Sequence, residues 1–330
     1  ISTFTPACST PQNSMTTIDC PCASLAKLVS DINLVNNESI SSKDRADRDV
    51  KLIELMLNQP NLALPRCVTP PPQLDMGERA SSHLDLRAVL ASIICPSFSG
   101  SLDNLHDSDE AVNLVAGHRD LPPNHSGRTI FSKRYLSVDP LGSDRLRRAL
   151  GLFVERHIRP LIVDDEETNE DGRSPETNGN GASTAQRLEV VYQARPTLRV
   201  QLPGQPALNV AHIDYGYKRQ PTEVNVWIPL TRVCAENTLF VESHPGKGDY
   251  TPLNAEPPSF WLFYGNQCQH YAVPNSSTAL TRVSLDLRVM RSDHFIEEYI
   301  HPASKKSTTD FRLGGHYTST AIERDWRSKS

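Results

Sequence analysis

The sequence has no long hydrophobic run: no stretch in its 330 residues approaches the roughly 18 consecutive apolar residues of a membrane-spanning helix. Basic residues are not in excess either, because 34 lysines and arginines stand against 39 aspartates and glutamates, for a formal net charge of −5. Nucleic-acid binding needs a concentrated positive surface. We therefore expect neither a membrane partner nor a nucleic-acid partner.

Features of exported proteins are also missing. The opening ISTFTPACSTPQ has neither the charged start nor the apolar stretch of a secretory signal. The 7 cysteines are an odd number at scattered spacings, which favours free thiols in a reducing compartment over a disulfide framework. We expect a cytoplasmic protein, in which the glycosylation sequons at Asn37, Asn124 and Asn275 are chance matches.

The patterns that are present divide the chain into three parts, which we expect to form one integrated domain. Residues 1–163 alternate between helical periodicity and proline-rich or polar stretches. Helices are predicted over 23–35, 44–58, 84–94 and 143–162. Residues 164–186 are acidic and poor in apolar side chains, which indicates a flexible insertion. Residues 187–330 are rich in β-forming runs and are expected to form the core on which the N-terminal region packs.

Alternating runs characterise this last part. In one run, Glu223, Asn225 and Trp227 would share one face of a strand, while the apolar residues between them occupy the other. The run 280–290 alternates in the same way. Many short strands separated by glycine and proline turns predict a mainly β fold with flanking helices, namely a sandwich, barrel or jelly roll.

A set of metal-binding residue types lies within these runs. Only one residue separates His212 from Asp214, so on a strand both side chains would point to the same side and could bind one ion. His270 lies at the start of a later predicted strand. Two imidazoles and one carboxylate, with open positions opposite, form the facial triad of non-haem Fe(II) oxygenases.

Arg282 and Ser284, on one face of the run 280–290, would complete such a site. The co-substrate 2-oxoglutarate chelates iron through its 2-oxo group and one carboxylate, and its other carboxylate needs a bidentate cation and a hydroxyl donor. These two residues can supply both. We expect the metal on His212, Asp214 and His270, and 2-oxoglutarate on Arg282 and Ser284.

Several segments resemble the Fe(II)/2-oxoglutarate-dependent oxygenases, and most closely the branch of the streptomycin-biosynthesis-type hydroxylases. These segments are LRVQLPG, AHIDYGY, EVNVWIPLT, NTLFVES, FYGNQCQHY and TRVSLDLRV, with FRLGGHY as a further candidate. The resemblance runs from Leu198 to Met290 and hardly touches the N-terminal half. It implies a double-stranded β-helix (jelly roll, cupin-like) core that uses Fe(II), 2-oxoglutarate and O2. Because the carboxylate position holds Asp214 rather than glycine or alanine, chloride has no vacant place on the metal, which argues against a halogenase.

Other residues are candidates for the surroundings of the metal. Trp227 is assigned to the 2-oxoglutarate pocket, with core packing as the alternative. Residues that could contact the substrate or orient the metal ligands are Arg199, Gln201, Asn225, Arg288, Asn237 and Glu242. For Arg288, the alternatives are a substrate acid and an acidic side chain of the protein. His294, His301 and His316 follow the core and are expected to face solvent.

The resemblance implies an oxygenase of specialised natural-product metabolism. It would oxidise an aliphatic C–H bond of a small, amino-acid-like metabolite, by hydroxylation or by oxidative cyclisation or desaturation. No catalytic side chain beyond the metal centre is assigned, and the protein is expected to be a monomer or homodimer. Two alternatives stay open. A cupin-like metalloenzyme that does not use 2-oxoglutarate would not need Arg282, and a non-catalytic jelly-roll binding protein would not need an intact metal triad.

Overall fold

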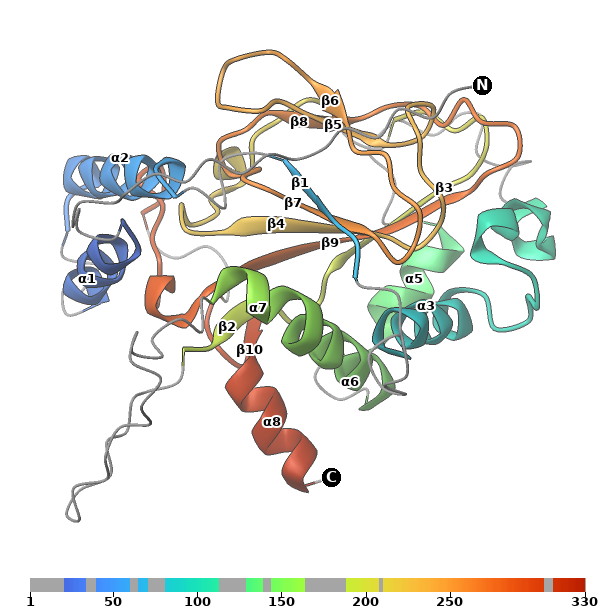
Figure 1. Ribbon diagram of the computed structural model, residues 1–330, viewed down its shortest axis with the longest axis horizontal. Coiled ribbons are helices and arrows are strands. Elements are labelled where there is room, and N and C mark those ends of the chain that lie inside the picture. The colour runs from blue at the N-terminus through green and yellow to red at the C-terminus, as the bar shows by residue number, and fades with distance from the viewer. Residues whose placement is uncertain are drawn as a thin grey trace, which may run out of the picture.

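The computed structural model describes residues 21–33, 40–59, 65–70, 81–112, 129–138, 144–163, 188–207, 210–305 and 311–329 (Figure 1). The acidic insertion predicted over 164–186 lies outside these residues. The helices are α1 (Pro21–Asn33), α2 (Ser42–Leu57), α3 (Ser81–Ile94), α5 (Ile130–Ser137), α6 (Asp144–Phe153), α7 (Arg159–Ile162) and α8 (Thr320–Lys329). The helices predicted over 23–35, 44–58 and 84–94 are therefore confirmed to within three residues at each end.

The strands are β1 (Arg66–Val68), β2 (Val190–Gln193), β3 (Thr197–Gln201), β4 (Val224–Pro229), β5 (Leu239–Val241), β6 (Thr251–Pro252), β7 (Phe260–Phe263), β8 (His270–Ala272), β9 (Arg282–Arg291) and β10 (Tyr317–Ser319). Seven described strands form one antiparallel sheet in the order β1-β7-β4-β9-β2-β10, with β3 also paired to β9. The remaining three form a small sheet in the order β6-β5-β8.

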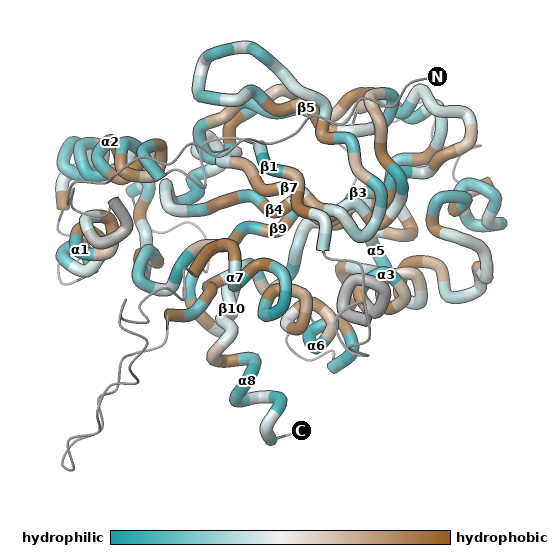
Figure 2. Tube along the Cα trace, in the orientation of Figure 1, coloured by the Kyte–Doolittle hydropathy of each residue, from teal (hydrophilic) through white to brown (hydrophobic). Residues whose placement is uncertain are grey.

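The central strand of the large sheet, β9, is buried on both faces. Its outer face is apolar, with Val283, Leu285, Leu287 and Val289 fully buried. Helix α6 packs against this face. The ring of Phe153 on α6 contacts that of Phe260 on β7, with centroids 5.4 Å apart. Figure 2 shows hydrophobic residues on α6 and α7 and on the strands beside them. Burial of this face supplies the main hydrophobic core.

The inner face of the large sheet is polar and is directed at the small sheet. Four pairs of directly opposed residues lie on it: Arg199 with Ser284, Gln201 with Arg282, Asn225 with Arg288, and Trp227 with Asp286. Side chains of this face reach the small sheet, because Gln201 Nε2 donates to the Val273 carbonyl at 3.1 Å, directly after β8. The register of β9 with β3 and β4 thus collects charged and amide side chains between the two sheets.

The helix predicted over 143–162 consists of two helices joined by a π-helical turn. After α6, residues Val154–Ile158 form this turn, in which the Arg159 N–H donates to the Val154 carbonyl, and α7 follows. Pro160 explains the interruption, because proline has no N–H to donate to the preceding turn. The segment therefore stays helical but widens by one residue before the proline.

The predicted class, a mainly β fold with flanking helices, is confirmed, and the strands of the large sheet pair antiparallel. The double-stranded β-helix topology stays a prediction. No helix among the described residues is both long and apolar enough to cross a membrane. Free thiols in the described part of the chain are Cys67, Cys95, Cys234 and Cys268, as expected from their spacing.

Candidate metal centre

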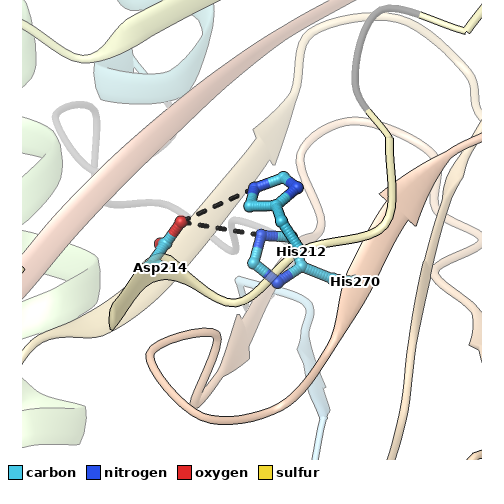
Figure 3. A group of neighbouring side chains, drawn as sticks. All are labelled: His212, Asp214 and His270. Carbon is cyan, nitrogen blue, oxygen red and sulfur yellow. Dashed lines mark ion pairs between the residues drawn. The ribbon is translucent and has the colours of Figure 1, made fainter. Parts of the chain in front are cut away.

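The three predicted metal ligands lie together between the two sheets (Figure 3). Their ligand atoms all lie within 4.8 Å of one another. Asp214 Oδ1 is 3.7 Å from His212 Nε2 and 3.8 Å from His270 Nε2. Each imidazole donates its Nδ1–H to a main-chain carbonyl, that of Val210 at 2.7 Å and that of Cys268 at 3.1 Å. Each Nε2 is therefore left with a lone pair directed at the site.

The local structure around these ligands differs from the expected single strand. His212 forms only an isolated bridge with His270, in which each N–H donates to the other carbonyl at 3.1 and 3.0 Å. Asp214 begins a 3₁₀ helix, η5 (Asp214–Tyr217), and its N–H donates to the Gly265 carbonyl at 2.9 Å. The prediction that one strand face presents His212 and Asp214 is therefore wrong. They converge because the chain turns into η5 against the segment that precedes β8.

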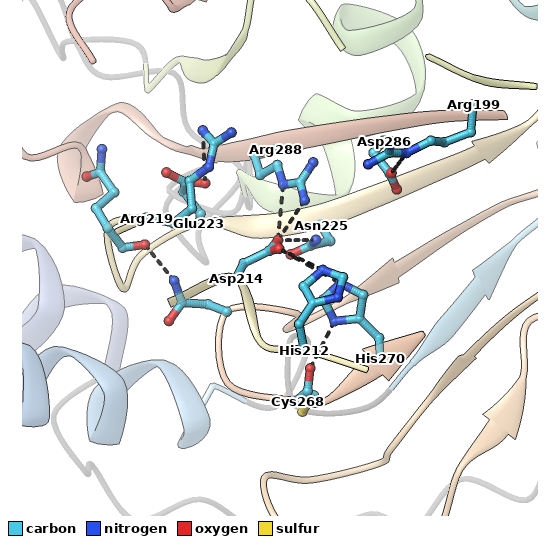
Figure 4. Close-up of polar contacts among 12 residues, drawn as sticks. Arg199, His212, Asp214, Arg219, Glu223, Asn225, Cys268, His270, Asp286 and Arg288 are labelled. Carbon is cyan, nitrogen blue, oxygen red and sulfur yellow. Dashed lines mark hydrogen bonds and ion pairs between the residues drawn. The ribbon is translucent and has the colours of Figure 1, made fainter. Parts of the chain in front are cut away.

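The two oxygens of Asp214 have different surroundings (Figure 4). Oδ2 accepts hydrogen bonds from Asn225 Nδ2 at 2.7 Å and from Arg288 Nη2 and Nε at 2.8 and 3.1 Å. Oδ1 faces the two histidines. Burial alone would raise the pKa of Asp214, but Arg288, His270 and Asn225 together hold it well below the ordinary value. The carboxylate is therefore ionised, and one of its oxygens is free for a cation.

Burial also keeps His270 suitable as a metal ligand. Burial lowers the pKa of His270, and the negative charge of Asp214 only partly offsets this effect. At neutral pH, His270 is therefore uncharged and can donate its lone pair. Two imidazoles and one carboxylate match the donor set of the 2-His-1-carboxylate triad.

Arg282 is buried at the opposite end of the inner face of β9, and only 1% of its surface is exposed. Its Nη1 donates to the carbonyls of Asn237 and Thr238 at 3.0 and 3.4 Å. Neither its Nε nor the buried Oγ of Ser284 has a hydrogen-bond partner among the described residues. Burial lowers the pKa of Arg282 to about 10, so the guanidinium stays charged at neutral pH. These two orphaned groups would fit a carboxylate ligand.

The other inner-face candidates have different roles. Asn225 and Arg288 both bind Asp214, so the acidic partner of Arg288 belongs to the protein and is a predicted metal ligand. Arg199 Nε lies 3.8 Å from Asp286. Trp227 is fully buried and belongs to the hydrophobic core, in line with the packing alternative.

Three more candidates brace main-chain segments. Gln201 Nε2 donates to the carbonyls of Gln205, Pro206 and Val273. The Asn237 side chain accepts from the Cys234 N–H. Glu242 accepts main-chain N–H groups of Gly246, Gly248 and Gln269, the last of which precedes His270.

The expectation that three histidines face solvent is wrong for His294, whereas His301 and His316 are half-buried. His294 is only 2% exposed. His301 packs beside Tyr215 with ring centroids 4.5 Å apart, and Arg219 donates to His316 Nε2 at 2.7 Å. Burial and the charge of Arg219 lower the pKa of His316 to about 3. For His316 the cause is that the chain after β9 folds back onto the core, where β10 pairs with β2.

Two further residues of the site carried no sequence signal that identified them. Gly265 lies so close to Asn225 that an added Cβ would be 2.8 Å from the side-chain Cγ and Nδ2. Asp49, on α2, accepts a hydrogen bond from the hydroxyl of Tyr215, the residue after Asp214. Both contacts join segments that are distant in the sequence, so local periodicity could not reveal them.

Comparison with known proteins gives one curated relative. Streptomycin biosynthesis protein StrG of Streptomyces griseus is 34% identical over 134 residues, which are 39% of this chain and 61% of that protein. The match thus spans about three-fifths of the relative's length. It confirms the resemblance to the streptomycin-type branch. No protein-family profile matches the chain.

Similar solved structures are non-haem oxygenases of low sequence identity. The nickel complex of the non-haem monooxygenase ThoJ is 12% identical, with a TM-score of 0.37, and the alignment covers 81% of this chain and 92% of that one. The α-ketoglutarate-dependent epimerase SnoN from nogalamycin biosynthesis is 10% identical, with a TM-score of 0.37 and coverages of 82% and 100%. CytC3 with Fe(II) and α-ketoglutarate is 14% identical, with a TM-score of 0.35 and coverages of 80% and 95%. TM-scores below 0.5 do not establish a common fold.

Proposed function

We propose that this protein is a non-haem Fe(II)/2-oxoglutarate-dependent oxygenase that oxidises an aliphatic C–H bond of a small metabolite in natural-product metabolism. The observation that carries the proposal is the placement of Arg282. This buried guanidinium has no carboxylate within ion-pair distance among the described residues. It shares one strand face with Arg288, which holds the carboxylate of the candidate metal triad. A metalloenzyme without a dicarboxylate co-substrate would have no use for this buried charge.

Under this proposal each part of the site has a separate task. His212, Asp214 and His270 would hold Fe(II), and Arg282 with Ser284 would bind the distal carboxylate of 2-oxoglutarate. When bound, iron and 2-oxoglutarate supply the activation of O2 and the oxidising power needed to attack an unactivated C–H bond.

The remaining residues orient these groups. Asn225 and Arg288 occupy Oδ2 of Asp214, so that Oδ1 is directed at the metal position. The carbonyls of Val210 and Cys268 fix the planes of the two imidazoles. Phe263 packs its ring edge-on to His270, with centroids 5.3 Å apart, and shields that ligand from water.

The substrate is proposed to be a small, polar, amino-acid-like molecule, with hydroxylation as the expected reaction and cyclisation or desaturation as its variants. The polar inner face supports this class. Asn225 Oδ1 is buried beside Asp214 without a hydrogen-bond partner among the described residues, and could accept from a substrate amino or hydroxyl group. Arg199 stays the candidate for a substrate acid, because Arg288 is engaged with Asp214.

The proposal is tested by anaerobic titration of the metal-free protein with Fe(II) and then 2-oxoglutarate, monitored by the weak visible charge-transfer band of the chelate. We expect the band in the wild type, its loss in Asp214→Ala, and a large increase in the 2-oxoglutarate concentration required in Arg282→Met. Arg232 forms an exposed ion pair with Glu256, and Arg232→Met serves as the control. Iron binding without a band would instead favour the cupin-like metalloenzyme that does not use 2-oxoglutarate.

A further inference from the structure

Helix α2 buries charged residues where an amphipathic helix would ordinarily bury apolar ones. Asp49 is 1% exposed and its neighbour Arg48 is 8% exposed. Arg48 Nε donates to Asp49 Oδ1 at 2.9 Å, and Arg48 Nη2 donates to the Ile300 carbonyl at 3.0 Å. Oδ2 of Asp49 accepts from the hydroxyls of Tyr299 at 2.5 Å and Tyr215 at 2.9 Å. The carboxylate is therefore held by three side chains.

One of these contacts leads directly to the candidate metal centre. Tyr215 follows Asp214 in η5, and its N–H donates to the Asn266 carbonyl at 3.1 Å, next to the bond between the Asp214 N–H and Gly265. The turn that carries Asp214 is thus fixed on one side by the 265–266 main chain and on the other by Asp49. In Figure 1, α2 lies at the left ends of β4 and β7, beside this turn.

Because the Asp49 carboxylate is buried, its hydrogen bond restrains the position of the Tyr215 hydroxyl. An ionised group removed from water is tolerated only where donors satisfy it, and Asp49 keeps Arg48 and one tyrosine as donors when either tyrosine hydroxyl is removed. The Tyr215 hydroxyl has to meet a fixed acceptor, and the adjacent Asp214 backbone is restrained with it. Removing the hydroxyl would break the hydrogen bond that joins η5 to α2, while Asn225 and Arg288 still hold the Asp214 side chain.

We propose that Asp49 is a positioning residue for the metal centre: through the Tyr215 hydroxyl, helix α2 holds η5 so that the Asp214 carboxylate faces His212 and His270. The inference rests on the proposed metal-binding function. It assigns a role in the site to the N-terminal region, which the sequence resemblance hardly covers.

The chain offers a matched pair of variants to test this role. Tyr215→Phe and Tyr299→Phe each remove one hydroxyl from the same carboxylate oxygen, but only Tyr215 is joined to a metal ligand. With Co(II) as the probe, we expect Tyr215→Phe to weaken metal affinity about tenfold, the lower end of the effect of outer hydrogen-bond partners, and to alter the visible Co(II) bands. Tyr299→Phe should keep the wild-type spectrum and an affinity within about twofold of the wild type, even though it lowers Tm at least as much.

Substitutions of Asp49 test the same role if Tyr215→Phe does not fold. Asp49→Asn keeps an acceptor oxygen for Tyr215, so it should bind Co(II) more tightly than Asp49→Ala. Wild-type affinity and spectrum in Tyr215→Phe, or equal weakening in both tyrosine variants, would overturn the inference while the proposed function stands. If the wild type itself fails to bind Co(II), the proposed function falls and the inference falls with it.

Discussion

The two ends of the inner face of β9 each carry a buried arginine, and the two arginines have opposite surroundings. Arg288 contacts Asp214 through two nitrogens, and this carboxylate raises the pKa of the guanidinium even though burial opposes it. Among the described residues, Arg282 donates only to main-chain carbonyls, and burial lowers its pKa to about 10. The same residue type on one face of one strand thus has a carboxylate partner at one end and, among the described residues, no ion-pair partner at the other.

This difference separates a charge that belongs to the fold from a charge kept for a ligand. A buried ion pair whose partner is removed leaves an uncompensated charge, which costs several kcal/mol, so Arg288 and Asp214 depend on each other. Arg282 has no such ion-pair partner among the described residues, and the charge of Asp286 only partly offsets its desolvation, so a bound anion would compensate the rest. Substitution at the paired end should therefore lower both stability and metal affinity, whereas substitution at the other end should lower 2-oxoglutarate affinity with little change in stability.

The largest effect is expected at the paired end. Arg288→Met leaves the Asp214 carboxylate buried beside the histidines without its main cation, so we expect unfolding in urea to require about 3–5 kcal/mol less free energy. Metal affinity should fall by about 10- to 100-fold, because Oδ2 of Asp214 loses two of its hydrogen bonds. A Co(II) titration of the same variant checks this. Unchanged stability would contradict the pairing.

At the other end, Arg282→Met should lower the affinity for 2-oxoglutarate without lowering the free energy of unfolding. We expect 2-oxoglutarate affinity to fall about 100-fold, or ~2.7 kcal/mol, since charge-assisted hydrogen bonds to a carboxylate are lost. Co(II) affinity should match the wild type. The free energy of unfolding should stay within about 1 kcal/mol of the wild type, because an uncompensated buried charge is replaced by an apolar side chain. A stability loss as large as that of Arg288→Met would remove the contrast.

A smaller effect is expected at Gly265, whose main chain lies against Asn225 beside Asp214. A Cβ at Gly265 would lie 2.8 Å from Asn225 Nδ2, so Gly265→Ala should displace the amide from Asp214 and cost about 1–3 kcal/mol of stability. Gly216→Ala in η5 is the matched control, because nothing lies within 4 Å of its added Cβ. Thermal unfolding and Co(II) titration of both variants measure the difference, and similar behaviour of the two would show that the close approach does not matter.

The smallest effect is expected from the hydroxyl beside Arg282. Ser284→Ala removes one buried donor that has no partner among the described residues. We expect 2-oxoglutarate affinity to fall about fivefold, or ~1 kcal/mol, with no loss of stability. The anaerobic band titration measures the affinity. A variant that lost stability but kept affinity would indicate that Ser284 serves the fold.

The sequence predicted the faces of the strands but not their partners. Alternation along 280–290 placed Arg282 and Arg288 on one face, because side chains of a strand point alternately to its two sides. It could not show that Arg288 lies opposite Asn225, since the register of β4 against β9 depends on contacts far apart in the sequence.

Tertiary packing also overrode two local expectations. Asp214 leaves the extended conformation for η5 because its N–H finds the Gly265 carbonyl, a partner that follows β7. His294 is polar and lies after the last long strand, so solvent exposure was the simple expectation, yet its 3₁₀ helix (Ser292–His294) packs against α1 and the side chain is buried. In both cases the deciding contact is long-range, which local pattern does not record.

The isolated bridge between His212 and His270 has a consequence for how an ion would enter. Reciprocal main-chain hydrogen bonds set the spacing of the two imidazoles, so the loss of conformational entropy needed to bring these distant residues together occurs during folding. The metal site is therefore formed before the ion binds, unlike that of small zinc domains, which fold only when the metal is bound. Metal exchange should accordingly leave the far-UV circular dichroism spectrum unchanged, and its rate should be governed by dehydration and entry of the ion.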